Sequence, residues 1–158
     1  MQIREVYKSK DDYEKTQNEH TLNDGDWHWM SFVAKGKRAN ESLFRSHCPV
    51  TLKCLEESIG ESGHTLMTDT PFSYTFFSTM APGSKIAPHF GPTNLRLRCH
   101  FPLIVPEECF IKVAGEGRRW DEGKMLIFDD SYEHETANLS REEDRVLLLF
   151  DIWHPDLH

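Results

Sequence analysis

The chain has 158 residues, of which 28% are charged and 38% hydrophobic, and its formal net charge is −8. This length is enough for one domain with a hydrophobic core, and the composition is that of an ordinary globular protein. The acidic charge disfavours nucleic acid or an anionic membrane as the main partner. The highly charged start predicts no secretory signal, and four cysteines without a C-x-x-C pair predict free thiols in the cytoplasm.

The first part of the chain is predicted to contain a polar arm followed by short helices. Residues 1–26 are rich in Asn, Asp, Glu and Lys, and we expect a loosely packed arm with one short helix over residues 11–18. A single domain is expected over residues 27–158, beginning with an apolar cluster at Trp27. Residues 49–58 are expected to form a helix, because a proline stands at its start and the apolar residues follow helical spacing.

After Gly63 the hydrophobic pattern changes from a helical period to the period of two that is typical of strands. Short aromatic and β-branched runs are separated by glycine and proline turns, which predicts a β-sandwich or a jelly-roll barrel. The last run is almost continuously apolar, so we expect it to be covered on both faces. The expected strands are residues 72–80, 85–89, 95–105, 110–114, 118–120, 125–128 and 145–153.

One of these strands carries a line of basic side chains. Alternation places Arg96, Arg98 and His100 on one face of the strand and apolar residues on the other. Such a stripe suits a small anion that bears carboxylates, because the guanidinium fork matches a carboxylate. The alternative is an ordinary polar outer face of an antiparallel sheet.

Two histidines flank the predicted strands. His89 precedes the basic strand, and His134 lies in an acidic loop, residues 129–135, that follows an apolar strand. In a jelly roll both could converge at one barrel mouth, where two imidazoles would suit a first-row metal ion. Either histidine taken alone could equally be an inert surface residue.

Arg145 opens the last, intensely apolar strand. An arginine that points into a barrel is costly unless it meets an anion, so Arg145 is a candidate anion ligand. The alternative is that it lies at the barrel rim and reaches water. Ser78, within an aromatic strand, could donate its hydroxyl to the same anion, or be an ordinary strand serine.

Three runs in order, HFGPTNLRLRCH, WDEGKMLIFDDSYEHE and RVLLLFDIWHPDL, closely resemble the aspartyl/asparaginyl β-hydroxylase family. The resemblance extends from about Trp27 to the C-terminus. It implies a mainly β fold, the double-stranded β-helix (a cupin-like jelly roll), with short N-terminal helices. It also implies an oxygenase that uses Fe(II), 2-oxoglutarate as co-substrate, and O2.

The resemblance assigns roles to residues of this chain. His89 and His134 match the iron ligands. Ser78, Arg98, His100 and Arg145 match the positions that hold 2-oxoglutarate, and Arg98 could instead contact an acidic substrate together with Arg96.

Most such oxygenases add a carboxylate ligand to the two histidines. In this family the first motif is H-x-G, and Gly91 stands here in the place of the acid. We therefore expect water at the remaining metal position, and an aspartate introduced at 91 would be expected to offer a third ligand. The water would be held by one of four nearby acids: Asp129, Asp130, Glu133 or Glu135.

The implied activity is hydroxylation of an Asp- or Asn-type substrate, or of another carboxylate-bearing peptide, amino acid or small metabolite. Neither nucleic acid nor a membrane is expected as a partner. The rival interpretation is a metal- or ligand-binding jelly-roll module without catalysis. A third possibility, a cupin-like enzyme with another metal and no co-substrate, has less need of so many basic groups.

Overall fold

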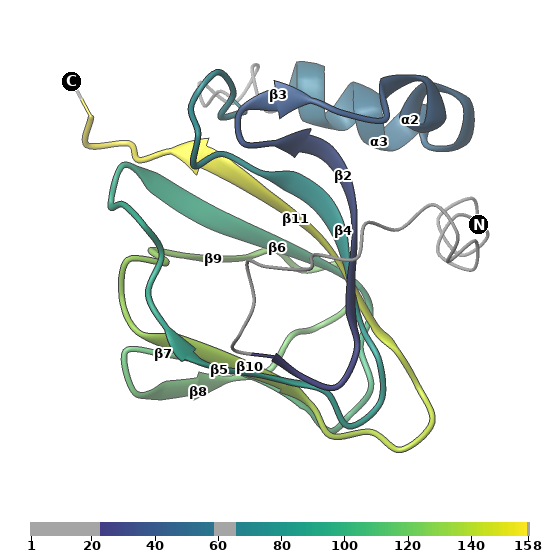
Figure 1. Cartoon of the computed structure of the whole chain (residues 1–158), viewed down its shortest axis with the longest axis vertical. Helices are drawn as coiled ribbons and strands as arrows, with labels where there is room; N and C mark the ends of the chain where they lie inside the picture. The colour runs from purple at the N-terminus through teal and green to yellow at the C-terminus, as the bar shows by residue number, and fades with distance from the viewer. Residues whose placement is uncertain (1–22, 59–65, 158) are drawn as a thin grey trace.

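The computed structural model describes residues 23–58 and 66–157, and within them the chain forms two antiparallel sheets that face each other (Figure 1). In spatial order the larger sheet contains β3 (Lys37–Arg38), β2 (Trp27–Ala34), β4 (Thr75–Met80), β11 (Arg145–Trp153), β6 (Arg96–Ile104) and β9 (Leu126–Phe128). The smaller sheet contains β1 (Asn23–Asp24), β5 (Lys85–His89), β10 (His134–Asn138), β7 (Cys109–Val113) and β8 (Glu116–Arg118).

The chain passes back and forth between the two sheets from β4 onwards. β4, β6, β9 and β11 belong to the larger sheet, while β5, β7, β8 and β10 belong to the smaller one. This alternation is the winding of a double-stranded β-helix, and it confirms the predicted jelly-roll fold. It also brings the ends of strands that are distant in sequence to one barrel interior, where a site can be assembled.

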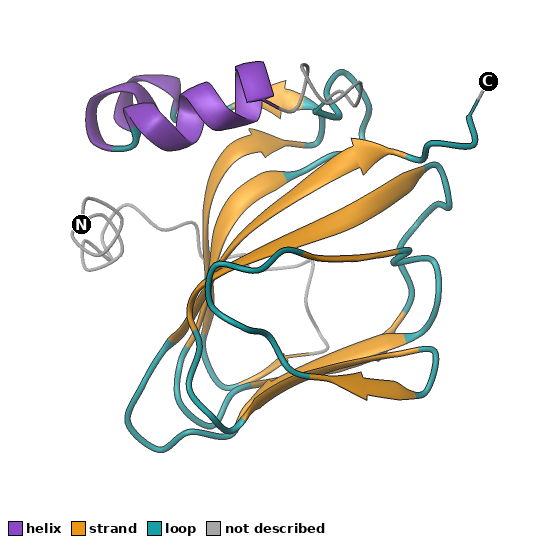
Figure 2. Ribbon diagram, turned by 180° about the vertical axis from the view of Figure 1, so that it is seen from behind, coloured by secondary structure: helices purple, strands orange, loops and turns teal. Residues whose placement is uncertain are grey.

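Two short helices cover the outer face of the larger sheet (Figure 2). They are α2 (Glu41–His47) and α3 (Pro49–Lys53), which continues as a π-helical turn, η2 (Cys54–Ser58). Their buried side chains, Phe44, Leu52 and Leu55, pack against the apolar outer face of the strands. The helix predicted over residues 49–58 is therefore confirmed, and helix α2 precedes it.

Strand β11 is covered on both faces, as its apolar sequence predicts. Leu148, Phe150 and Ile152 face the helices, whereas Leu147 and Leu149 belong to clusters inside the barrel. Eight of its nine residues are buried. Packing on both faces holds this strand in place, and with it the positions of Arg145 and Asp151.

The start of the described chain joins the barrel. Residues 23 and 24 of the expected arm form β1, which pairs with β5. The expected helix over residues 11–18 lies outside the described residues. All four cysteines are free, and three are buried whereas Cys54 is exposed. Among the described residues, no helix has the length and apolar character needed to cross a membrane.

Candidate metal and anion site

The two candidate metal ligands lie side by side on neighbouring strands. His89 is the last residue of β5 and His134 the first residue of β10, and their Cα atoms are register partners. The centroids of their imidazole rings are 4.1 Å apart. The prediction of a loop around His134 was wrong at this residue, because β10 begins there and pairs with both β5 and β7. The position of the ring is consequently fixed by strand pairing.

The hydrogen bonds of the two rings define their tautomers. His89 Nδ1 lies 2.8 Å from the carbonyl oxygen of Ala87, and His134 Nδ1 lies 2.9 Å from that of Tyr132. A carbonyl oxygen only accepts, so each Nδ1 carries the proton and each Nε2 keeps its lone pair. Burial lowers the pKa of His134 to about 4, which keeps its ring neutral near pH 7.

Two imidazoles whose Nδ1 atoms are bonded to carbonyls and whose Nε2 atoms are free form a donor pair suited to a first-row metal ion. The part of the chain that the structure describes contains no group of three or more His, Cys, Asp or Glu side chains that could hold a metal. The two histidines therefore have no third protein ligand among these residues.

Gly91 leaves no room for a side chain. A Cβ atom at this position would lie 2.5 Å from both Cγ and Oδ2 of Asp130, and the backbone N–H of Gly91 donates to the Asp130 carbonyl at 2.6 Å. The idea that an aspartate at 91 could serve as a third ligand is therefore wrong, because the space is filled by the Asp130 carboxylate.

Among the four acids considered as partners of a metal-bound water, Asp130 is the one beside Gly91. Asp129 instead accepts a hydrogen bond from the backbone of Ser131 at 2.9 Å, and Glu135 forms an ion pair with Lys112 at 3.3 Å. Glu133 is exposed. The geometry therefore favours Asp130 for this position.

Arg96 and Arg98 lie on the inner face of β6, as the alternation predicts, and are paired with buried carboxylates. Arg96 donates two hydrogen bonds to Asp130, from Nε at 3.0 Å and from Nη2 at 2.5 Å. Its remaining nitrogen, Nη1, lies 3.2 Å from an Asp151 carboxylate oxygen. Arg98 donates two hydrogen bonds to Asp151, from Nε at 2.9 Å and from Nη2 at 3.1 Å. Its Nη1 lies 3.3 Å from an Asp130 carboxylate oxygen. Burial alone would raise the pKa of Asp130, but Arg98 and Arg96 together hold it below its ordinary value.

Sequence reasoning missed Asp151. The available signal was a carboxylate near the end of a strand that is otherwise continuously apolar.

The predicted role of Arg96 in substrate binding stays a prediction. Its three nitrogens all bond to protein groups, including the carbonyl of Phe72, whereas Arg98 retains a side-chain exposure of 14%.

Arg145 is buried inside the barrel and has no carboxylate partner among the described residues. It is 2% exposed, so the alternative that it reaches water at the rim is wrong. One terminal nitrogen donates to Ser78 Oγ at 2.7 Å, and Trp27 Nε1 donates to the same oxygen at 2.9 Å. Its Nε has no hydrogen-bond partner, and burial lowers its pKa to about 10. An unpaired guanidinium of this kind indicates a place for an anion.

His100 presents a second unpartnered nitrogen in the same interior. Trp120 Nε1 donates to His100 Nδ1 at 3.3 Å, which places the proton of the neutral ring on Nε2. That Nε2 is buried and unpartnered, and burial holds the His100 pKa well below its ordinary value. The Trp120 ring also lies 5.2 Å from the Arg145 guanidinium carbon. Sequence reasoning did not single out Trp120.

Phe128 contacts both a candidate metal ligand, His134, and a candidate anion ligand, His100. Its ring centroid lies 5.5 Å from that of His134 and 5.0 Å from that of His100, and both contacts are edge-to-face. The structure thus brings His89, His134, His100, Arg145 and Ser78 into one barrel interior. It is lined by aromatic rings, and its two unpartnered nitrogens come from a histidine and an arginine.

Known proteins resemble this chain over most of its length. The family model for aspartyl/asparaginyl β-hydroxylases matches residues 1–155. The chain belongs to the aspartyl/asparaginyl β-hydroxylase family. Among relatives, the human aspartyl/asparaginyl beta-hydroxylase is 37% identical over 142 residues, which are 89% of this chain and 18% of that protein. The rat aspartate beta-hydroxylase domain-containing protein 2 is 36% identical over 135 residues, which are 84% of this chain and 37% of that protein.

This family member thus spans only a minor part of the length of those relatives. Among solved structures, a predicted oxalate decarboxylase from Thermotoga maritima superposes with a TM-score of 0.54 at 13% identity. The superposition covers 90% of this chain and 92% of the other. At this identity the likeness concerns the fold alone.

Proposed function

We propose that this chain is an Fe(II)- and 2-oxoglutarate-dependent hydroxylase. The observation that carries the proposal is the buried pair of unpartnered nitrogens, Arg145 Nε and His100 Nε2, in the same interior as the adjacent histidines His89 and His134. A dianionic co-substrate would satisfy both nitrogens and compensate the buried charge of Arg145. Membership of the aspartyl/asparaginyl β-hydroxylase family supports the same reaction class.

His89 and His134 would hold the iron through their Nε2 atoms. When bound, iron and 2-oxoglutarate would supply the oxidising power that inserts one oxygen atom of O2 into a C–H bond, with succinate and CO2 as the co-products. The carbonyls of Ala87 and Tyr132 orient the two rings and hold the proton on Nδ1 of each, which leaves Nε2 available to a metal ion. These carbonyls act as the partners that orient metal-bound histidines.

The anion-binding residues would orient the co-substrate. Arg145, itself oriented by Ser78, would bind the far carboxylate of 2-oxoglutarate. Because Trp120 fixes its tautomer, His100 can donate an Nε2–H hydrogen bond to an oxygen of the same molecule. The aromatic lining excludes water, which strengthens both contacts.

Arg96, Arg98, Asp130 and Asp151 form an Arg–Asp cluster that would contribute to both the metal site and substrate binding. Asp130, kept ionised by its arginines, offers a carboxylate oxygen beside Gly91 that can accept a hydrogen bond from a water molecule. Arg98, the more exposed of the two arginines, would contact the co-substrate or an acidic substrate. Arg96 would contribute to substrate binding mainly by holding Asp130 in place.

The proposed substrate bears an Asp- or Asn-type group or another carboxylate, on a peptide, an amino acid or a small metabolite. The names of the relatives, which refer to aspartyl and asparaginyl residues, support the first of these. The four free cysteines fit the reducing cytoplasm that we propose as its location.

The proposal is tested by adding Fe(II) and 2-oxoglutarate to the protein without oxygen. The weak visible absorption band of the iron–2-oxoglutarate chelate should appear, and admission of air should then yield succinate. His89→Ala and His134→Ala should each abolish succinate formation and weaken iron binding with little change in the thermal unfolding midpoint. His47→Ala, an exposed histidine of helix α2, is the matched control and should behave as the wild type. Near-normal iron binding and activity in either site variant would refute the two-histidine centre.

A non-catalytic binding module is the second candidate function. It is favoured by one observation, namely that only two side chains among the described residues are placed to hold a metal. In that case the absorption band would form, but air would produce no succinate. The same experiment therefore separates the two functions.

A further inference from the structure

A second, separate cleft opens between the two sheets. It has a volume of about 630 Å³ and lies between β8 and β9, the terminal strands of their sheets within the described chain. This volume falls in the range of about 300–1,000 Å³ that is usual for small-molecule sites. The residues assigned to metal, co-substrate or substrate do not line it.

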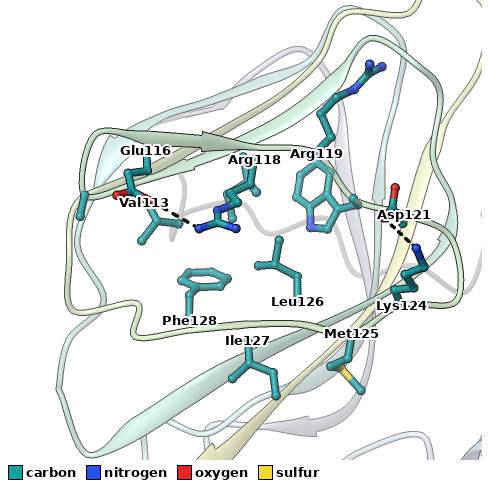
Figure 3. A pocket seen from close by; sticks show the side chains of 13 residues that line it. Val113, Glu116, Arg118, Arg119, Asp121, Lys124, Met125, Leu126, Ile127 and Phe128 are labelled. Atoms are coloured by element: carbon teal, nitrogen blue, oxygen red, sulfur yellow. Dashed lines mark hydrogen bonds and ion pairs between the residues drawn. The ribbon is translucent and has the colours of Figure 1, made fainter.

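The floor of the cleft is apolar. Leu126 and Phe128 point from β9 into it, whereas their neighbours Met125 and Ile127 point away (Figure 3). Side chains from β7 and the β8–β9 connection complete the floor: Ile111, Val113 and Trp120. A ring or a branched hydrocarbon group placed on this surface would remove it from water, and two of the floor residues are aromatic.

One arginine supplies a charge directed into the cleft. The guanidinium of Arg118 points toward the interior above Phe128, whereas the next residue, Arg119, points away (Figure 3). Arg118 is paired with Glu116 at 3.5 Å, and these side chains are 68% and 77% exposed. A pair so long and so exposed is weak, so the guanidinium can exchange Glu116 for the carboxylate of a ligand.

We propose that the cleft is a binding site for a small amphipathic carboxylate. Its apolar body would lie on Leu126 and Phe128, and its carboxylate would pair with Arg118. Phe128 and Trp120 line the cleft and also contact His134 and His100, whereas none of the residues assigned to the metal or to 2-oxoglutarate lines it. The cleft therefore has a lining of its own, and a ligand paired with Arg118 does not require the hydroxylase function.

The test is a titration of the full chain with N-acetyl-L-phenylalanine, followed by 1H–15N NMR. The amide signals of β8 and β9 should shift saturably, with a dissociation constant on the order of 1 mM. Two probes separate the contributions: N-acetyl-L-phenylalaninamide lacks the carboxylate, and N-acetylglycine lacks the ring. Each should bind at least about fivefold more weakly.

Two arginine variants separate a specific contact from general charge. Arg118→Ala should weaken N-acetyl-L-phenylalanine binding by about fivefold or more, whereas Arg119→Ala removes the same charge from the adjacent residue and should have little effect. Saturating 2-oxoglutarate should leave the affinity unchanged. The proposal is overturned by no saturable shift up to about 20 mM, by equal effects of the two variants, or by displacement with 2-oxoglutarate.

Discussion

At the scale of single residues, Arg145 is a buried cation for which the described residues provide no carboxylate partner. A buried cation without an anionic partner destabilises a folded protein, because its hydration is lost without full compensation. Here the guanidinium has the Ser78 hydroxyl and the face of Trp120 as compensation, while its Nε has no partner. The folded protein thus carries a cost that a bound anion would remove.

Substitution of Arg145 should therefore affect binding and stability in opposite directions. Arg145→Met keeps the volume of the side chain and removes the buried charge, so the free energy of unfolding should rise by about 1–3 kcal/mol. The same change, or Arg145→Ala, should weaken 2-oxoglutarate binding by about 100-fold or more, since breaking a buried ion pair costs about 3–5 kcal/mol. Arg145→Lys should restore only part of the affinity, because lysine lacks the planar fork.

Isothermal titration of 2-oxoglutarate into anaerobic, metal-loaded protein measures the affinities, and urea unfolding measures the stability. Arg141→Ala is the matched control, since this exposed arginine lies four residues earlier in the connection before β11. Unchanged 2-oxoglutarate affinity in Arg145→Ala would remove Arg145 from the site.

Trp120 is predicted to act through His100. Trp120→Phe keeps an aromatic face beside Arg145 but removes the N–H group that bonds to His100 Nδ1. The His100 ring should then populate both neutral tautomers, and 2-oxoglutarate affinity should fall about fivefold, as expected for one lost hydrogen bond. Long-range 1H–15N NMR correlations of the imidazole report the tautomer directly. Trp153→Phe, on a partly exposed tryptophan, should change neither reading.

At the scale of secondary-structure elements, much of the barrel could be predicted from residue patterns. The bounds of β5 and β11 agree with prediction to the residue, since proline, glycine and charged turns delimit them. Strand β10 was missed because its sequence, HETAN, is polar. Its hydrophobic alternation is weak, and its strand conformation comes from pairing with β5 and β7 on either side.

The site residues also divide into those that a local pattern predicts and those that it does not. Alternation along β6 predicted the common face of Arg96, Arg98 and His100 correctly. Partners contributed by other segments, such as Asp151 on β11 and Trp120 between β8 and β9, carried no local pattern and could not be matched to these residues by spacing. The choice of Asp130 among four neighbouring acids likewise required the approach of the β5–β6 connection at Gly91.

The close approach of Gly91 to Asp130 predicts the effect of a substitution at Gly91. Gly91→Ala should destabilise the protein by about 1–3 kcal/mol, because the new methyl group would overlap the Asp130 carboxylate and displace it. Iron affinity should also fall, since Asp130 is placed beside the metal site. Gly117→Ala is the matched control, because a Cβ atom at that position meets no atom within 4 Å. Equal unfolding midpoints for the two variants, measured by thermal unfolding monitored by circular dichroism, would contradict the steric argument.

At the scale of the whole molecule, buried charges join elements that are far apart in sequence. Arg96 and Arg98 on β6 are linked to Asp151 on β11 and to Asp130 in the segment between β9 and β10. The Tyr74 backbone N–H also donates to Asp151. The cluster thus ties the wall of the larger sheet to the segment that precedes His134. Its integrity should govern the shape of the barrel mouth as well as the stability of the fold.

The cluster should make the protein sensitive to acid. Because the folded-state pKa of Asp130 is held below its ordinary value, the stabilisation is complete above about pH 4 and is lost as the pH falls through the folded pKa. Asp130→Asn leaves Arg96 and Arg98 short of a counter-charge and should cost about 3–5 kcal/mol at pH 7. Since the carboxylate is then absent at every pH, this variant should also lose less stability than the wild type between about pH 5 and pH 3.

Urea unfolding at several pH values measures both effects of the Asp130 substitution. Asp129→Asn is the matched control, because the amide oxygen can still accept the hydrogen bond from Ser131 while the same charge is removed from the adjacent residue. Its stability should stay close to that of the wild type at pH 7, and its acid dependence should be retained. A similar loss of stability in both variants at pH 7 would show that general charge, rather than the Arg96 and Arg98 pairing, holds the barrel mouth together.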